Sequence, residues 1–195
     1  VDFSDFAELV SWADRIDSAS FASASEAIDR SHAIMQLAAV VEHHGNGALF
    51  ESLVPRLARE PIEDIATDAE VQSLWQPIDE AQRSTRERIA NAAERKGRVV
   101  YVDLHDAPLA SSGKFVAYAV APDCMYSVSL IRMKRHFKIS LGFNPWCGRD
   151  RDRHIGRIGQ RFGGGGHPVV GAFSMPLDQL DKARAIAGDI VTELN

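Results

Sequence analysis

The sequence has little of what exported or membrane-spanning proteins need. Its 195 residues include only two cysteines, Cys124 and Cys147, and these do not form a close C-x-x-C pair. The longest apolar runs fall well short of the ~18 residues of a membrane span, and no basic start followed by an apolar stretch opens the chain. These absences predict a soluble protein of a reducing cytoplasm, without a membrane partner.

The net charge excludes a generally basic coat for nucleic acid, but positive charge is concentrated in one segment. The formal net charge is −5. Residues 1–129 hold 11 Lys and Arg against 21 Asp and Glu, a balance of −10, whereas residues 130–161 hold 9 against 2, a balance of +7. A basic segment of this kind raises the local concentration of an anionic ligand. A solvated basic surface is the alternative.

The first half of the chain has the apolar spacing of helices. In "FAELVSWADRIDSASF" the apolar residues recur three and four positions apart. The same pattern predicts one helix in "SEAIDRSHAIMQLAAVVEHHGNG", ending at Gly45, and another from about Ala48 to Arg59 that contains Pro55. A long helix from about Asp68 to Arg95 contains Pro77 and has the charged exposed face of a helix that connects two bodies.

After Gly97 the apolar period changes to two, which predicts strands. The strands are expected in "RVVYVDL", "CMYSVSLIRM", "FKISLGF" and "PVVGAFSM", and helices in "GKFVAYAVA", "RDRHIGRIGQRF" and "LDQLDKARAIAGDIVTEL". The chain is therefore expected to be an α/β protein, in which an N-terminal helical segment and a long linker helix precede a small α/β domain with a mixed sheet. We expect two domains, residues 1–96 and 97–195.

Four consecutive glycines stand directly before a histidine and a proline in "RFGGGGHPVVGAF", residues 161–173. In a regular element each glycine costs roughly 0.5–1 kcal/mol relative to alanine, so the run needs a compensating reason. One reason is a tight helix-to-strand turn with positive φ angles. The other is a bare backbone surface at which a phosphate approaches the peptide N–H groups.

The run "GGGGHPVVG", with "SVSLIRM" and "ISLGFNPW" upstream of it, resembles the C-terminal substrate-binding domain of the DHH phosphoesterase superfamily. The resemblance implies that residues 97–195 are this domain and that residues 1–96 are the helical end of the catalytic domain with its linker helix. Members of the superfamily hydrolyse phosphoester or phosphoanhydride bonds with a pair of Mn²⁺ or Mg²⁺ ions. Their substrates include short RNAs, single-stranded nucleic acid, cyclic dinucleotides and polyphosphate.

The resemblance also implies which residues bind the substrate phosphate. The backbone N–H groups of Gly164, Gly165 and Gly166 would donate to it, and His167 would add a donor. A hydrogen-bonded turn histidine is the structural alternative for His167. An arginine would bind the phosphate with two parallel hydrogen bonds, and Arg132 is the candidate, with Arg135, Arg157 and Arg161 as alternatives. Asn144 is the candidate polar partner.

For the metal, the resemblance selects "WADRIDSASF", because relatives have an aspartate followed four residues later by phenylalanine. Here that aspartate is Asp17, and Asp14 is the competing candidate. Carboxylate oxygens suit Mn²⁺ or Mg²⁺, although an aspartate that decorates a helix end is the structural alternative. The acid and two histidines of "VEHHGNG" are interpreted as the end of a helix, where histidine side chains interact well with the helix dipole.

No Asp-x-Asp near a first strand and no Asp-His-His occurs in the chain. Because the sequence also begins with Val1 and opens on a helical pattern, we expect a fragment or processed product. It would be the C-terminal part of a metal-dependent phosphoesterase, holding a phosphate-containing nucleotide or single-stranded nucleic acid but inactive alone. One alternative is a noncatalytic nucleic-acid-binding domain like that at the C-terminus of alanyl-tRNA synthetases. Another is a soluble α/β interaction domain with a structural glycine turn.

Overall fold

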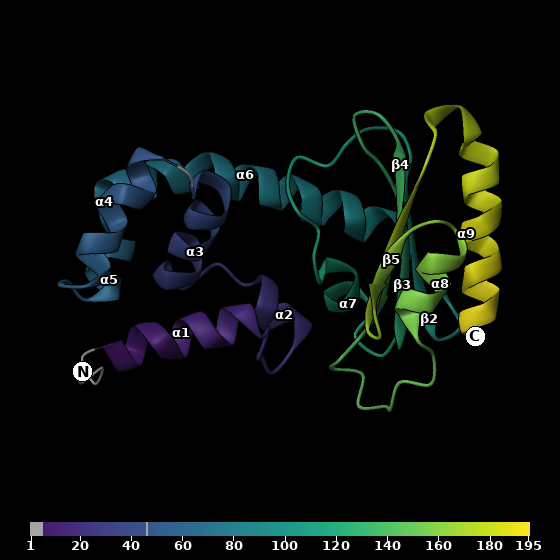
Figure 1. Cartoon of the computed structure of the whole chain (residues 1–195), viewed down its shortest axis with the longest axis horizontal. Helices are drawn as coiled ribbons and strands as arrows, with labels where there is room; N and C mark the ends of the chain where they lie inside the picture. The colour runs from purple at the N-terminus through teal and green to yellow at the C-terminus, as the bar shows by residue number, and fades with distance from the viewer. Residues whose placement is uncertain (1–5, 46) are drawn as a thin grey trace. The chain divides into compact units, whose positions relative to one another are not determined.

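The computed structural model describes residues 6–45 and 47–195, and the chain divides into two compact units. The first unit takes in the described residues up to Ala22 together with Glu26–Arg83, and the second takes in Ser23–Ser25 and Ser84–Asn195. Among the described residues, no helix has the length and apolar character needed to cross a membrane. The elements are labelled in Figure 1.

The first unit is helical (Figure 1). Its elements are α1 (Ala7–Asp17), α2 (Ala24–Ile28), α3 (Ala33–His44), α4 (Ala48–Leu57), α5 (Ile62–Ala66) and the first part of α6 (Ala69–Ala92). Side chains from α3 to α6 form its apolar core, among them Ile34, Leu37, Val40, Leu53, Ile65, Val71 and Trp75. Burying a large aliphatic or aromatic side chain contributes about 1.5–3 kcal/mol, so this core stabilises a set of short helices that would not persist alone.

Two helical predictions for this half need correction. The single helix expected between residues 25 and 44 is broken into α2 and α3, because the Asp29 carboxylate accepts hydrogen bonds from the Ser31 N–H and hydroxyl, both at 2.8 Å. A side chain that satisfies the backbone in this way competes with helical hydrogen bonding. The long helix expected to reach Arg95 ends at Ala92, since the next four residues pair with a strand.

The second unit is built on a six-stranded mixed sheet, as the sequence predicted (Figure 1). Its strands are β1 (Ala93–Lys96), β2 (Val99–Leu104), β3 (Tyr126–Arg132), β4 (Phe137–Phe143), β5 (Gly165–His167) and β6 (Val170–Met175). The order is β1-β2-β3-β4-β6-β5, in which only the β2–β3 pairing is parallel. The crossover between these two parallel strands contains α7 (Val116–Val120).

One face of the sheet carries the core of the unit. Alternate residues of the three central strands point to the same face, and there they pack with α8 (Ile155–Arg161) and α9 (Leu180–Leu194). The buried side chains include Tyr126, Val128, Leu130, Phe137, Ile139, Leu141 and Phe173 from strands and Ile155, Ile158, Ala183, Ala187, Ile190 and Leu194 from helices. On this face the Arg184 Nε of α9 also donates to the Asp103 carboxylate of β2 at 2.8 Å.

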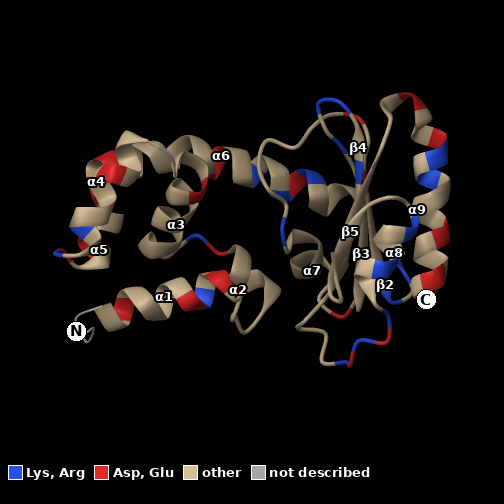
Figure 2. Ribbon diagram, in the orientation of Figure 1, with Lys and Arg blue, Asp and Glu red and all other residues tan. Residues whose placement is uncertain are grey.

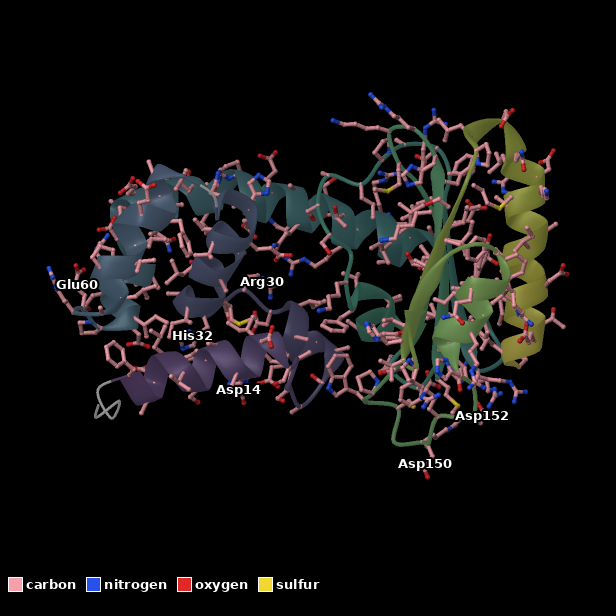
Figure 3. All side chains as sticks on the ribbon, in the orientation of Figure 1. Asp14, Arg30, His32, Glu60, Asp150 and Asp152 are labelled. Atoms are coloured by element: carbon pink, nitrogen blue, oxygen red, sulfur yellow. The ribbon has the colours of Figure 1, made fainter. Side chains whose placement is uncertain are left out.

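The loop between β4 and α8 is fixed to the core by Asp152. The Tyr126 hydroxyl donates to Asp152 Oδ1 at 2.6 Å, and the Arg98 guanidinium donates to Oδ2 at 2.8 Å. The same hydroxyl accepts the backbone N–H groups of Asp152 and Arg153. The Tyr126 hydrogen bond, helped by the charge of Arg98, lowers the pKa of the Asp152 carboxyl below its ordinary value of 3.8. Figure 3 shows Asp150 at the tip of the same loop, pointing away from the protein.

We expect Asp152→Asn to lower the melting temperature at pH 7. A carboxyl whose pKa is depressed by folding contributes stability above its unfolded pKa, and that contribution is lost as the pH falls through its folded pKa. The difference in melting temperature between parent and variant should therefore shrink as the pH is lowered below about 3.8. Asp150→Asn is the matched control and should melt like the parent at every pH. A constant difference for Asp152→Asn across the pH series would contradict this prediction.

Candidate functional site

The four glycines join α8 to the edge of the sheet. Gly163 follows the last turn of α8 with a φ of +77°, which a glycine adopts without strain. The Gly164 N–H then donates to the Gly159 carbonyl at 3.1 Å. The last two glycines and His167 form β5, which pairs with β6, whereas the sequence predicted only a turn before a strand. The run is thus a turn for its first half and an edge strand for its second.

Close packing explains why glycine occupies most positions around this edge. A Cβ added at Gly156 of α8 would lie 2.7 Å from the Gly166 carbonyl, and one added at Gly171 of β6 would lie 2.8 Å from the Ile155 carbonyl oxygen. A Cβ at Gly164 would overlap the carbonyl oxygen of Ala172. Helix α8 therefore packs its backbone directly against the backbone of β5 and β6. Side chains at these positions would push the helix off the sheet.

Gly165 is different from its neighbours. No atom lies within 4 Å of the position that its Cβ would occupy, and its φ is not in the positive range. Neither the space around it nor its backbone conformation therefore requires glycine. The absence of a side chain leaves a bare stretch of backbone on the edge strand, and a ligand is one reason to keep it bare.

The residues beside Gly165 on neighbouring strands are also small. Gly165 pairs with Ala172 of β6, Ala172 with Ser140 of β4, and Ser140 with Ser129 of β3. Paired residues on adjacent strands point to the same face, about 4.8 Å apart. We call this row, Ser129, Ser140, Ala172 and Gly165, the small-residue row, and all four residues are partly exposed. It lies on the face opposite α8 and α9, and it offers two hydroxyl groups next to the bare edge.

His167 occupies the same face at the end of β5. It pairs with Val170, whose partner on β4 is Gly142. The imidazole is exposed, and its ring has no hydrogen-bond partner among the described residues. The structural alternative of a hydrogen-bonded turn histidine therefore has no support in the contacts of this side chain. An exposed imidazole beside bare backbone can donate a hydrogen bond to an anion.

The other two predicted substrate residues do not lie at the glycine edge. Arg132 is the last residue of β3 and pairs with Phe137, at the far end of the strands from His167, with β4 and β6 between β3 and β5. Asn144 is fully buried, and its amide donates to the Pro122 and Cys124 carbonyls while its oxygen accepts the Trp146 N–H. Its hydrogen-bonding capacity is used within the fold. These two choices placed residues by proximity in sequence, which the strand register does not follow.

Sequence reasoning missed the serines of the small-residue row. Their signal was present, because Ser127 and Ser129 alternate with buried apolar residues in "YSVSL", and Ser140 does the same in "KISLGF". Strand alternation places such residues on the face opposite the core. Only the register, which brings Ser129 and Ser140 level with Gly165, identifies them as neighbours of the glycine edge.

The candidate metal ligands of the first unit are two exposed carboxylates. Asp14 and Asp17 lie in the last turns of α1, three residues apart and therefore on one side of the helix. The histidines of "VEHHGNG" lie in the last turn of α3, as expected. The described residues hold no group of three or more His, Cys, Asp or Glu side chains that could bind a metal ion. The residues described here therefore do not supply the complete ligand set that a Mn²⁺ or Mg²⁺ site needs.

One Asp-x-Asp does occur in the second half, at Asp150 and Asp152, but its geometry does not suit a metal site. Asp152 is committed to Tyr126 and Arg98. Asp150 points away from the protein (Figure 3). The two carboxylates therefore do not converge.

Comparisons with known proteins support the fold. No protein-family model matches the chain, and no curated protein matches it in sequence. Among solved structures, it resembles the pGpG-specific phosphodiesterase PggH from Vibrio cholerae, with a TM-score of 0.79 and 18% sequence identity over 98% of this chain and 68% of that one. It also resembles a structure described as the DHH domain of a member of the s1p family of ribosomal proteins, with a TM-score of 0.50 and 13% identity over 83% of this chain and 42% of that one.

The chain thus spans about two thirds of the first structure and less than half of the second. Identities this low carry the fold and not the activity. The shared architecture agrees with the resemblance carried by "GGGGHPVVG" and its two upstream strands. The chain therefore has the fold of the DHH superfamily.

Proposed function

We propose that this chain is the substrate-holding part of a metal-dependent phosphoesterase, and that the glycine edge binds a phosphate group of a nucleotide or short oligonucleotide. In this proposal residues 97–195 are the substrate-binding domain, and residues 1–96 are the helical end of a catalytic domain with its linker helix. The single observation that carries it is Gly165, a glycine that neither packing nor backbone conformation requires.

The residues around Gly165 have the chemistry to hold a phosphate. Backbone N–H groups of an edge strand can donate to its oxygens, because the side of β5 away from β6 has no neighbouring strand among the described residues. The hydroxyls of Ser129 and Ser140 and the imidazole of His167 add side-chain donors on the same face. These groups would fix the position and orientation of the phosphate, which is how a binding domain contributes to phosphoryl chemistry carried out elsewhere.

The metal of such a reaction would be Mn²⁺ or Mg²⁺, with Asp17 or Asp14 as a ligand, as the sequence resemblance implies. Because the described residues supply no complete ligand set, we derive no catalytic step through the metal. The printed specificity of the Vibrio cholerae phosphodiesterase makes the linear dinucleotide pGpG the first ligand to test.

Gly165→Ala should weaken pGpG binding about tenfold, or about 1.4 kcal/mol, because the added methyl group occupies the place of the approaching phosphate. The fold should not suffer, since open space surrounds the added Cβ and alanine restricts the unfolded chain. Calorimetric titration and thermal melting measure the two effects separately.

Two further alanine variants calibrate this result. Gly188→Ala adds the same methyl group in open space on α9 and should bind pGpG like the parent. Gly164→Ala, whose Cβ would overlap the Ala172 carbonyl, should lower the melting temperature. Parent-like binding by the Gly165→Ala protein would leave the glycine edge without a role in phosphate binding.

His167→Ala should weaken pGpG binding severalfold without changing the melting temperature, because the exposed ring has no partner within the described part of the fold. His136→Ala is the matched control, in the turn between β3 and β4 at the other end of the sheet. If both variants bind alike, the imidazole of His167 does not contact the ligand.

The 195-residue chain, supplied with Mn²⁺ and pGpG, should bind the dinucleotide but release no mononucleotide above the buffer control. The reason is that its described residues do not gather the carboxylates that hold a metal pair. Chromatography of the reaction mixture tests this. Product formation that is lost in the Asp17→Asn variant would show that the chain is active by itself and would sink the proposal of a holding part alone.

The noncatalytic alternative predicted from the sequence gives a different outcome. A domain like the one in alanyl-tRNA synthetases would bind a folded tRNA, and its affinity for pGpG would be no greater than for free phosphate. Competition between tRNA and pGpG for the chain therefore separates the two functions.

A further inference from the structure

Positive charge in the second unit divides into paired and unpaired arginines. Five arginines form ion pairs with carboxylates, namely Arg88, Arg95, Arg98, Arg161 and Arg184. By contrast, four arginines between β4 and the first turn of α8 form no ion pair with a carboxylate of the described chain, and we call them the arginine loop: Arg149, Arg151, Arg153 and Arg157. Figure 2 shows this charge along the loop below the sheet.

The acidic residues of the same loop do little to neutralise it. Asp152 is turned inward, where Tyr126 and Arg98 hold its carboxylate. Asp150 points outward at the tip (Figure 3). With the charge of Asp152 matched by Arg98, the four arginines and Asp150 leave a balance of +3. The alternation of charges in "RDRDRH" therefore disguises a positive surface.

Both ends of the loop are tied to the hairpin that carries the glycine edge. At its start the Phe143 N–H donates to the Val169 carbonyl at 2.8 Å, and at its end the Ile155 N–H donates to the Pro168 carbonyl at 3.0 Å. These two acceptors directly follow His167. The arginine loop is thus the nearest basic segment to the end of β5, whereas the basic turn between β3 and β4 lies at the opposite end of the strands.

We infer that the arginine loop continues the glycine edge into a binding surface for single-stranded nucleic acid longer than a dinucleotide. This inference rests on the proposed function, since one phosphate is taken to lie at Gly165 and the arginines bind the phosphates that follow it. Guanidinium groups bind phosphate oxygens with two parallel hydrogen bonds. Trp146, partly exposed in the same loop, offers a ring on which a base can stack, which favours nucleic acid over inorganic polyphosphate.

The test compares two triple variants that each lose three cations. Arg149, Arg153 and Arg157, whose side chains are exposed, are changed to glutamine in the first. The control changes Lys134, Arg135 and Lys138 of the β3–β4 turn and its start of β4 to glutamine. Both should melt like the parent. Binding of pGpG and of a single-stranded RNA about eight nucleotides long is measured over a salt series, a length within the range that single-strand binders cover.

The parent should bind the octamer more tightly than pGpG. The arginine-loop variant should lose about tenfold in octamer affinity, retain pGpG affinity within about twofold, and show a salt dependence shallower by about 2, since each phosphate contact on a single strand contributes about 0.7 to the slope. The control variant should keep the slope of the parent, because charges at the other end of the sheet are screened beyond about 8 Å at physiological salt.

Three results would overturn the inference: equal losses in the two triple variants, an octamer bound no more tightly than pGpG by the parent, or polyphosphate of similar length displacing the octamer with the same dependence on the three arginines. Failure of the proposed function has a different signature. In that case Gly165→Ala would bind both ligands like the parent, whether or not the arginine-loop variant lost the octamer.

Discussion

The backbone contact between α8 and the β5–β6 hairpin is the constraint on which the free edge of the second unit depends. A strand of three residues makes few ladder hydrogen bonds, and it keeps its place because Gly156 and Gly159 let the helix reach the carbonyl groups of the glycine run. Between these glycines, Ile155 and Ile158 bury their side chains in the core. One short helix therefore combines apolar anchoring with backbone contact. This is why a surface edge with almost no side chains of its own can still be rigid.

This contact separates the glycines of the run into those that build the edge and one that the edge does not need. Gly163 supplies a positive φ, and Gly164 and Gly166 avoid overlap with the backbone of β6. Gly165 lies between them on the face opposite α8, where nothing occupies the space of a side chain. The two explanations offered by the sequence, a tight turn and a bare backbone, are therefore not exclusive. The turn holds the strand in place, and the remaining position leaves its backbone accessible on the same face as Ser140 and Ser129.

The sequence predicted the central part of the second unit well, because strands β2, β3, β4 and β6 alternate clearly between buried and outward residues. It did not predict β1 or β5. Residues 93–96 continue a helical pattern, and they become a strand only because β2 offers them a partner, while a run of glycines has no apolar period at all. The candidate site divided in the same way. The glycines and His167 share a local motif, but Arg132 and Asn144 depended on strand register and burial, which a local pattern does not contain. For the same reason the serines of the small-residue row were not recognised.

Charge in the second unit follows a similar division between residues that hold the fold and residues that remain available. Arg98 is bound by Asp152, by the Leu194 carbonyl and by contact with the Tyr126 ring, so it fixes the β4–α8 loop to the end of α9. With that one pair in place, the loop backbone needs no further ion pair, and the other arginines can remain exposed at little cost in order. A loop fixed in this way presents its cations in a limited set of positions, which lowers the entropy lost when an anion binds. The acid that seems to dilute the basic segment in the sequence is thus what holds that segment in place for a ligand.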